Sequence, residues 1–223
     1  MGEEAAIQLA LPVIITRDQS SEDFMQEAEL AEGLAAAGLT YLGMVEPSAP
    51  LIPPRLAAFA NSAAADGNEW AASVESDAPD LRERFNHEWY MLAADQGLFS
   101  RENPEFLLAV AVEDEGGESG HRASWWARVG LRAEWDLAGA GAAAQVTGRG
   151  WGHPEFVMLS LDGNVIVRGS QGEKWTDVVC LRDPHRIRSL REMGARMTDS
   201  RSIPRETREA VARWLAHAAA GER

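Results

Sequence analysis

The chain has 223 residues, of which 45% are hydrophobic and 25% are charged, and its formal net charge is −14. This composition excludes an intrinsically disordered protein, and the length is sufficient for one substantial domain with its own core. Cys180 is the only cysteine, which excludes an intramolecular disulfide and a cysteine-based zinc site.

The N-terminal segment does not have the pattern of a signal peptide. It carries Glu3 and Glu4 where a basic region would stand, and Gln8 and Pro12 interrupt its apolar run. No stretch approaches the roughly 20 apolar residues that a membrane span needs. We therefore expect a soluble, cytoplasmic protein without a membrane segment. Twenty arginines against a single lysine, together with abundant alanine, favour a GC-rich bacterial genome.

The first half of the chain predicts alternating strands and helices. Residues 7–15 have the pattern of a buried strand. A helix then follows the capping residue Ser20 and ends at Gly38, and a second strand covers residues 39–45.

Four prolines between residues 47 and 54 predict an extended connection, followed by a short helix over 55–65. The strongest helix signal covers residues 79–96, where apolar side chains recur at helical spacing. Pro79 suits the first turn of this helix and Gly97 its end.

The second half predicts a sheet followed by two helices. Strand-like segments cover residues 106–112, 125–135, 142–147, 156–161, 165–168 and 175–181. Asp162 and Gly163 form a hairpin turn signal. The two C-terminal helices are predicted to start at Asp183, as a cap, and after Pro204.

This order predicts an α+β fold: a mostly antiparallel sheet of about five to seven strands, flanked by N-terminal and C-terminal helices. We expect a single domain over residues 1–223. The charged, glycine-rich loop at 113–120 is the best boundary for a subdivision into an acidic, helix-rich part (1–112) and a part with the sheet meander and the last helices (121–223).

Two segments resemble catalytic or cofactor motifs, and each lacks a required part. Residues 139–144 match a loose G-x-G-x-x-A pattern, but Val146 to Gly148 end any helix that would hold a pyrophosphate. His87-Glu88 has Met91 where a zinc protease needs its second histidine. The absence of a catalytic signature favours a protein that is not an enzyme, and we expect no cofactor and no metal.

One loop nevertheless combines groups that a small ligand site would use. Around Gly150 and Gly152, the loop at 149–155 contains Arg149 to hold an anion and Trp151 to contact a ligand. His153 and Glu155 are the candidate catalytic acid or base. These residues support our second hypothesis, a small enzyme or ligand-binding protein with its pocket at the loop from Arg149 to Glu155. A tight sheet connection with a packed tryptophan is the simpler interpretation of the same residues.

The charge distribution supports our first hypothesis, a module that binds a basic protein partner in the manner of an immunity protein, antitoxin or adaptor. Residues 1–115 hold 22 acidic and 5 basic side chains, whereas residues 116–223 hold 13 acidic and 16 basic ones. The acidic half would steer a basic partner, unless it pairs with the other half inside one fold. The candidate contacts are Glu27, Glu29, Glu32, Trp70, Asp80, Glu83 and Glu88.

A third hypothesis is nucleic-acid binding through the arginine-rich C-terminal helices. Residues 182–213 hold nine arginines and five acids. Arginines at this density would suit phosphate groups. The net charge of the whole chain repels nucleic acid, so this function is the least favoured of the three.

Overall fold

Seven strands in the described part of the chain form one antiparallel sheet. The computed structural model describes residues 27–46, 48–60, 69–112 and 123–221. The strands are β1 (Leu39–Met44), β2 (Glu69–Glu75), β3 (Glu105–Val112), β4 (Ala123–Leu131), β5 (Phe156–Leu159), β6 (Val165–Gln171) and β7 (Trp175–Arg182). They lie in the order β1-β4-β3-β5-β6-β7-β2, and each neighbouring pair is antiparallel.

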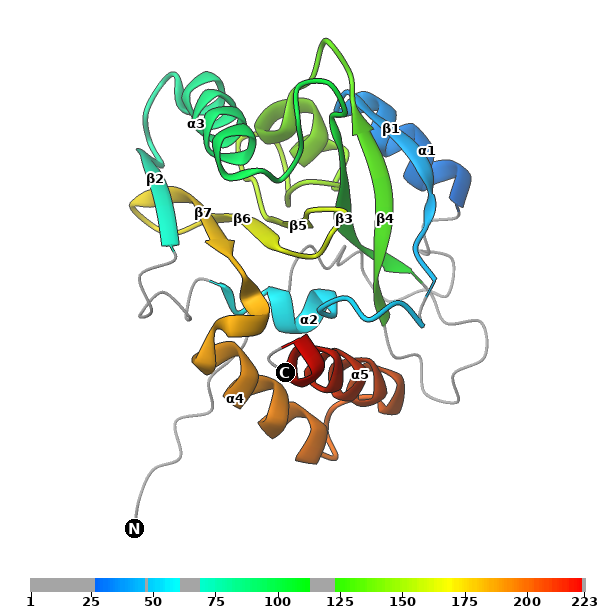
Figure 1. Ribbon diagram of the computed structural model, residues 1–223. Helices are drawn as coiled ribbons and strands as arrows, with labels where there is room; N and C mark the ends of the chain where they lie inside the picture. The colour runs from blue at the N-terminus through cyan, green and yellow to red at the C-terminus, as the bar shows by residue number, and fades with distance from the viewer. Residues whose placement is uncertain (1–26, 47, 61–68, 113–122, 222–223) are drawn as a thin grey trace.

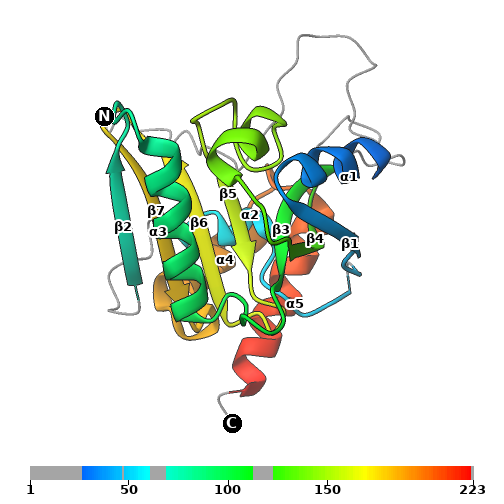
Figure 2. The same ribbon diagram turned by 90° about the horizontal axis from the view of Figure 1, so that it is seen from above.

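Helices cover both faces of this sheet, so the molecule has three layers (Figures 1 and 2). One face carries α1 (Glu27–Ala36), α3 (Leu81–Gln96) and the short π-helix η3 (Leu137–Gly141). The other carries α2 (Pro54–Ala57), α4 (Arg188–Asp199) and α5 (Arg205–Gly221). A 3₁₀ turn, η4 (Pro184–Arg186), leads from β7 into α4. The predicted α+β class, with an antiparallel sheet between N-terminal and C-terminal helices, is therefore confirmed.

The alternation of side chains along each strand creates two cores. In β5, Phe156 and Met158 pack beneath α3, whereas Val157 and Leu159 pack toward α4 and α5. All four are essentially inaccessible to solvent. Burial of such a side chain contributes about 1.5–3 kcal/mol, so the middle strands stabilise both layers at once. Beneath α3, Trp89 lies against several aromatic rings.

The boundaries of the clearest elements agree with the sequence signals. The helix predicted over 79–96 is α3, which begins two residues later and ends at Gly97 with a φ of 83°. Gly163 also has a positive φ, 77°, in the hairpin between β5 and β6. The last helix begins directly after Pro204, as expected. The strand predicted at 7–15, the cap at Ser20 and the loop at 113–120 lie outside the described residues.

The strand predicted at 142–147 is wrong. The chain there continues from η3 into a helical turn, because the Asp136 side chain accepts hydrogen bonds from the backbone N–H groups of Gly139 and Ala140. Val146 is buried in the core beneath α3. Its apolar character therefore reflects burial of a turn and not sheet pairing.

Two helix predictions were also inexact, and one strand was missed. The helix predicted over 55–65 is only the four residues of α2 within the described part. Asp183 has a φ of 50° and caps nothing with its side chain, so α4 starts at Arg188. The missed strand is β2, where apolar Ala72 and Val74 alternate with exposed residues.

Candidate functional site

The loop at 149–155 forms a tight hairpin that backbone hydrogen bonds close. Arg149 N donates to His153 O (3.0 Å), His153 N donates to Gly150 O (2.9 Å), and Glu155 N donates to Thr147 O (2.9 Å). Gly150 and Gly152 have φ values of 145° and 76°, which L side chains rarely adopt. The glycines therefore serve the turn itself.

The charged groups of this loop are paired with one another. Arg149 contacts both carboxylate oxygens of Glu155, with Nε–Oε2 at 2.5 Å and Nη2–Oε1 at 3.0 Å. Burial raises the pKa of Glu155, although Arg149 and Arg168 both act to lower it. Because Glu155 occupies the guanidinium fork, Arg149 does not present that fork to an external anion.

The two remaining candidates of the loop point to different neighbours. His153 Nδ1 contacts the Oε1 atom of Gln171 on β6. Trp151 is 58% exposed, and the Arg82 guanidinium of α3 lies 5.1 Å from the centre of its ring. The structure thus pairs Arg149 with Glu155, whereas His153 contacts Gln171 and Trp151 lies beside Arg82. A catalytic role for this loop stays a prediction.

The strand at the β7 side of the sheet has different properties. β2 pairs with β7 without interruption from Glu69–Leu181 to Glu75–Trp175, and no described strand pairs with its outer side. Trp70 is 37% exposed and Trp175 is 48% exposed. The exposed Glu75 lies directly across from Trp175. We call β2 with these two tryptophans the β2 edge.

The predicted partner-contacting acids fall into two groups. Trp70 belongs to the β2 edge, and α3, which packs on β2 and β7, carries Glu83 and Glu88 and directly follows Asp80. In contrast, α1 packs on β1, at the opposite edge of the sheet, as Figure 2 shows. The residues on α1 are Glu27, Glu29 and Glu32, and all three are exposed.

Several acids of the first group have a neighbouring arginine. Glu83 accepts a hydrogen bond from Arg82, which lowers the pKa of this carboxyl. Asp80 lies 3.8 Å from Arg84. Residues 69–96 nevertheless hold seven acids and two arginines, so the helix and strand at this edge remain strongly negative.

Sequence reasoning missed Trp175 and Glu75 as members of a site. The signal that was present is the alternation over residues 70–75, in which Trp70, Ala72 and Val74 share one face. This alternation indicates a strand but not the strand with which it pairs. The position of β2 at the edge of the sheet, next to Trp175, is a property of the tertiary structure.

The arginine-rich C-terminal helices contain acids at the spacing that neutralises them. Arg188 contacts Glu192 at 2.7 Å, and Arg205 contacts Glu209 at 2.7 Å, one helical turn apart in each case. These two arginines are therefore less available for phosphate groups than the sequence count alone indicates.

In the part of the chain that the structure describes, no three histidine, cysteine, aspartate or glutamate side chains are grouped as metal ligands would be. None of the described helices combines the length and apolarity that a membrane crossing needs. No family model, no curated protein and no solved structure matches this chain.

Proposed function

We propose that the protein is a binding module that recognises an extended, basic segment of a protein partner at the β2 edge. The observation that carries this proposal is an edge strand whose outer side no described strand covers, with an exposed tryptophan on it and another beside it. An extended peptide adds to such an edge through backbone hydrogen bonds, and neighbouring side chains provide specificity.

The β2 edge lacks several of the features that protect an edge strand. Natural sheets use charged side chains, especially lysine, as well as proline and β-bulges for this purpose. β2 contains neither lysine nor proline, its register with β7 is regular, and its only charged residues are Glu69 and Glu75 at its two ends. The opposite edge, β1, is different because its register shifts between Tyr41 and Gly43. This contrast supports β2 as the edge that receives a partner.

The surrounding charge favours a basic occupant. Glu75, Asp77 and Asp80 are exposed along the connection from β2 to α3. Their fields would increase the association rate of a basic segment, and salt would weaken this effect. Exposed tryptophans are common anchors in protein interfaces, where truncation of an anchor costs about 2 kcal/mol or more.

The test is affinity capture from lysate of the source organism with matched charge-reversal variants. Glu75→Lys/Asp80→Lys changes the β2 edge, and Glu32→Lys/Glu46→Lys changes two exposed acids near β1 by the same total charge. We expect a stoichiometric basic partner that the first variant loses and the second retains, with weaker binding at physiological than at low salt. Equal behaviour of the two variants, or binding that does not respond to salt, contradicts the proposal.

A second comparison separates this site from the loop at 149–155. Trp70→Ala or Trp175→Ala is expected to weaken binding of the captured partner about 30-fold, which corresponds to a loss of about 2 kcal/mol. Trp151→Ala, which also removes an exposed tryptophan, is expected to leave the affinity unchanged. The reverse result would favour the loop. Catalysis at the loop and nucleic-acid binding by the C-terminal helices stay predictions.

A further inference from the structure

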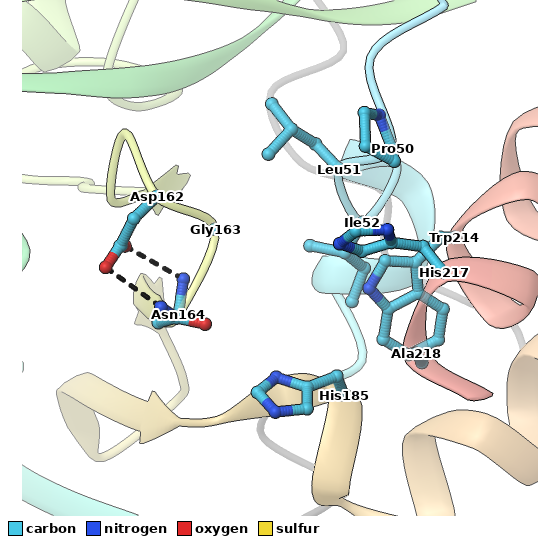
Figure 3. A pocket seen from close by; sticks show the side chains of 10 residues that line it. All are labelled: Pro50, Leu51, Ile52, Asp162, Gly163, Asn164, His185, Trp214, His217 and Ala218. Carbon is cyan, nitrogen blue, oxygen red and sulfur yellow. Dashed lines mark hydrogen bonds between the residues drawn. The ribbon is translucent and has the colours of Figure 1, made fainter. Parts of the chain in front are cut away.

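A cavity of about 220 Å³ lies on the other side of the molecule from α3, and Figure 3 shows its lining. The hairpin turn between β5 and β6 forms one wall, and α5 with η4 forms the opposite wall. The segment from Pro50 to Ile52 closes it with apolar side chains. This segment is fixed, because Trp126 Nε1 donates a hydrogen bond of 2.8 Å to Ile52 O.

The wall formed by the hairpin turn carries hydrogen-bond acceptors. The Asp162 carboxylate accepts from Ser160 Oγ at 2.5 Å, from Asn164 N at 3.1 Å and from Asn164 Nδ2 at 2.9 Å. Burial acts to raise the pKa of Asp162, but these hydrogen bonds outweigh it and lower the pKa below its usual value. The carboxylate is therefore charged at neutral pH. Because the Asn164 amide nitrogen faces Asp162, its oxygen points away from that carboxylate, into the cavity (Figure 3).

The opposite wall carries N–H groups. Trp214 is 3% exposed, and its indole N–H, which remains accessible, has no hydrogen-bond acceptor within the described part of the chain. This N–H faces the hairpin turn across the cavity (Figure 3). His185 from η4 and His217 from α5 also line the cavity, and neither imidazole has a partner among the described residues. Each imidazole supplies at least one N–H donor.

The indole N–H of Trp214 and the imidazole N–H groups are therefore available to donate hydrogen bonds to a ligand acceptor in this cavity. The two walls also have opposite preferences. The Asn164 oxygen suits an ammonium group, and the negative charge of Asp162 lies behind it, although the Asp162 carboxylate itself points away from the opposite wall (Figure 3). The N–H groups of Trp214 and the histidines suit a carboxylate.

We propose that this cavity binds a small zwitterion of the amino-acid class. The ammonium group lies toward the Asn164 oxygen, the carboxylate lies toward Trp214 and the two histidines, and an aliphatic side chain packs on Leu51 and Ile52. The volume is below the 300 Å³ or so at which pockets for drug-sized ligands begin, which matches a single small amino acid. A molecule with one charge would satisfy one wall and leave the other without a partner.

The test uses NMR of the indole N–H groups in the full-length protein, with a panel of the common L-amino acids as probes. Trp214→Phe identifies the Trp214 resonance by its disappearance. We expect at least one aliphatic amino acid to shift this resonance in a saturable manner. For valine, the matched probes are isobutylamine, which lacks the carboxylate, and 3-methylbutanoate, which lacks the ammonium group. Each is expected to bind at least tenfold more weakly than valine itself.

A matched pair of variants locates the binding. His217→Gln removes an imidazole from the cavity and is expected to weaken the affinity for the amino acid about tenfold. His87→Gln changes an exposed histidine of α3 and is expected to have no effect. The proposal is overturned if no amino acid shifts the Trp214 resonance at millimolar concentration. It is also overturned if the singly charged analogues bind as well, or if the two histidine variants behave alike.

Discussion

Replacement of Asp136 by alanine is expected to destabilise the whole segment that leads into the loop at 149–155. Asp136 Oδ1 accepts hydrogen bonds from Gly139 N at 2.8 Å and from Asn86 Nδ2 at 2.7 Å, and Oδ2 accepts from Ala140 N at 3.0 Å. The side chain thus starts η3 and attaches it to α3. η3 in turn holds the loop, because Gly152 N donates to Ala138 O at 2.8 Å.

The magnitude follows from the bonds that are lost. Removal of a helix cap costs about 1 kcal/mol, and loss of a hydrogen bond to a charged group costs about 1.5–3 kcal/mol. We therefore expect Asp136→Ala to lower the free energy of unfolding by about 3 kcal/mol. For a chain of this length that corresponds to a decrease in Tm of roughly 6–12 °C.

Urea unfolding followed by circular dichroism measures this change. Asp136→Asn keeps one acceptor oxygen and is expected to lose about half as much stability. Asp95→Ala removes an exposed carboxylate near the end of α3 and is expected to stay within about 0.5 kcal/mol of the unchanged protein. A change below about 0.5 kcal/mol for Asp136→Ala would refute the assignment of Asp136 as the group that holds η3.

Three further predictions concern single positions. Gly38 and Gly97 both have a positive φ, but a Cβ atom added at Gly38 would meet Glu134 O, whereas one added at Gly97 would meet nothing within 4 Å. Gly38→Ala should therefore lower the free energy of unfolding in urea by at least about 2 kcal/mol more than Gly97→Ala does, and equal losses would contradict this. Burial raises the pKa of Cys180 to about 12, so its thiol should not react with a thiol reagent at pH 8 until the protein unfolds. Rapid labelling of the native protein would be inconsistent with the structure. The pKa of Glu155 is raised, so the folded state binds the proton of this carboxyl more tightly than the unfolded state does. The free energy of unfolding should therefore fall relative to that of Glu155→Gln as the pH rises from about 4.5. A difference in stability between the two proteins that does not change with pH would count against this.

Much of the architecture was predictable from local signals. The helix at 81–96 and its end at Gly97 follow from apolar spacing and a glycine with a positive φ. The hairpin at Asp162 and Gly163 and the last helix after Pro204 follow in the same way from turn and cap chemistry. These features depend on residues within one or two turns of each other, so the amino-acid sequence contains them directly.

The errors occurred where a distant contact outweighs the local pattern. Residues 142–147 have apolar side chains suited to a strand, but Val146 packs in the core beneath α3, and Asn86 of α3 holds the Asp136 side chain that starts η3, so this segment is a helical turn. The end of β7 was predicted to pass directly into a helix at Asp183, whereas Asp183 has a positive φ and its backbone N–H bonds Asn164 O at 2.8 Å.

The sequence by itself determined the α+β class, the acidic character and most of the element boundaries, because composition and short-range periodicity determine these properties. Only the tertiary structure decided which charged groups meet. It paired Arg149 with Glu155, placed Trp70 and Trp175 at one edge of the sheet, and set His185 and His217 across a cavity from Asp162. The Arg149–Glu155 pair forms within one tight loop, but the other two groupings join residues from different elements. Trp70 and Trp175 are about a hundred positions apart, and no local pattern specifies their proximity because the order of strands in the sheet brings them together.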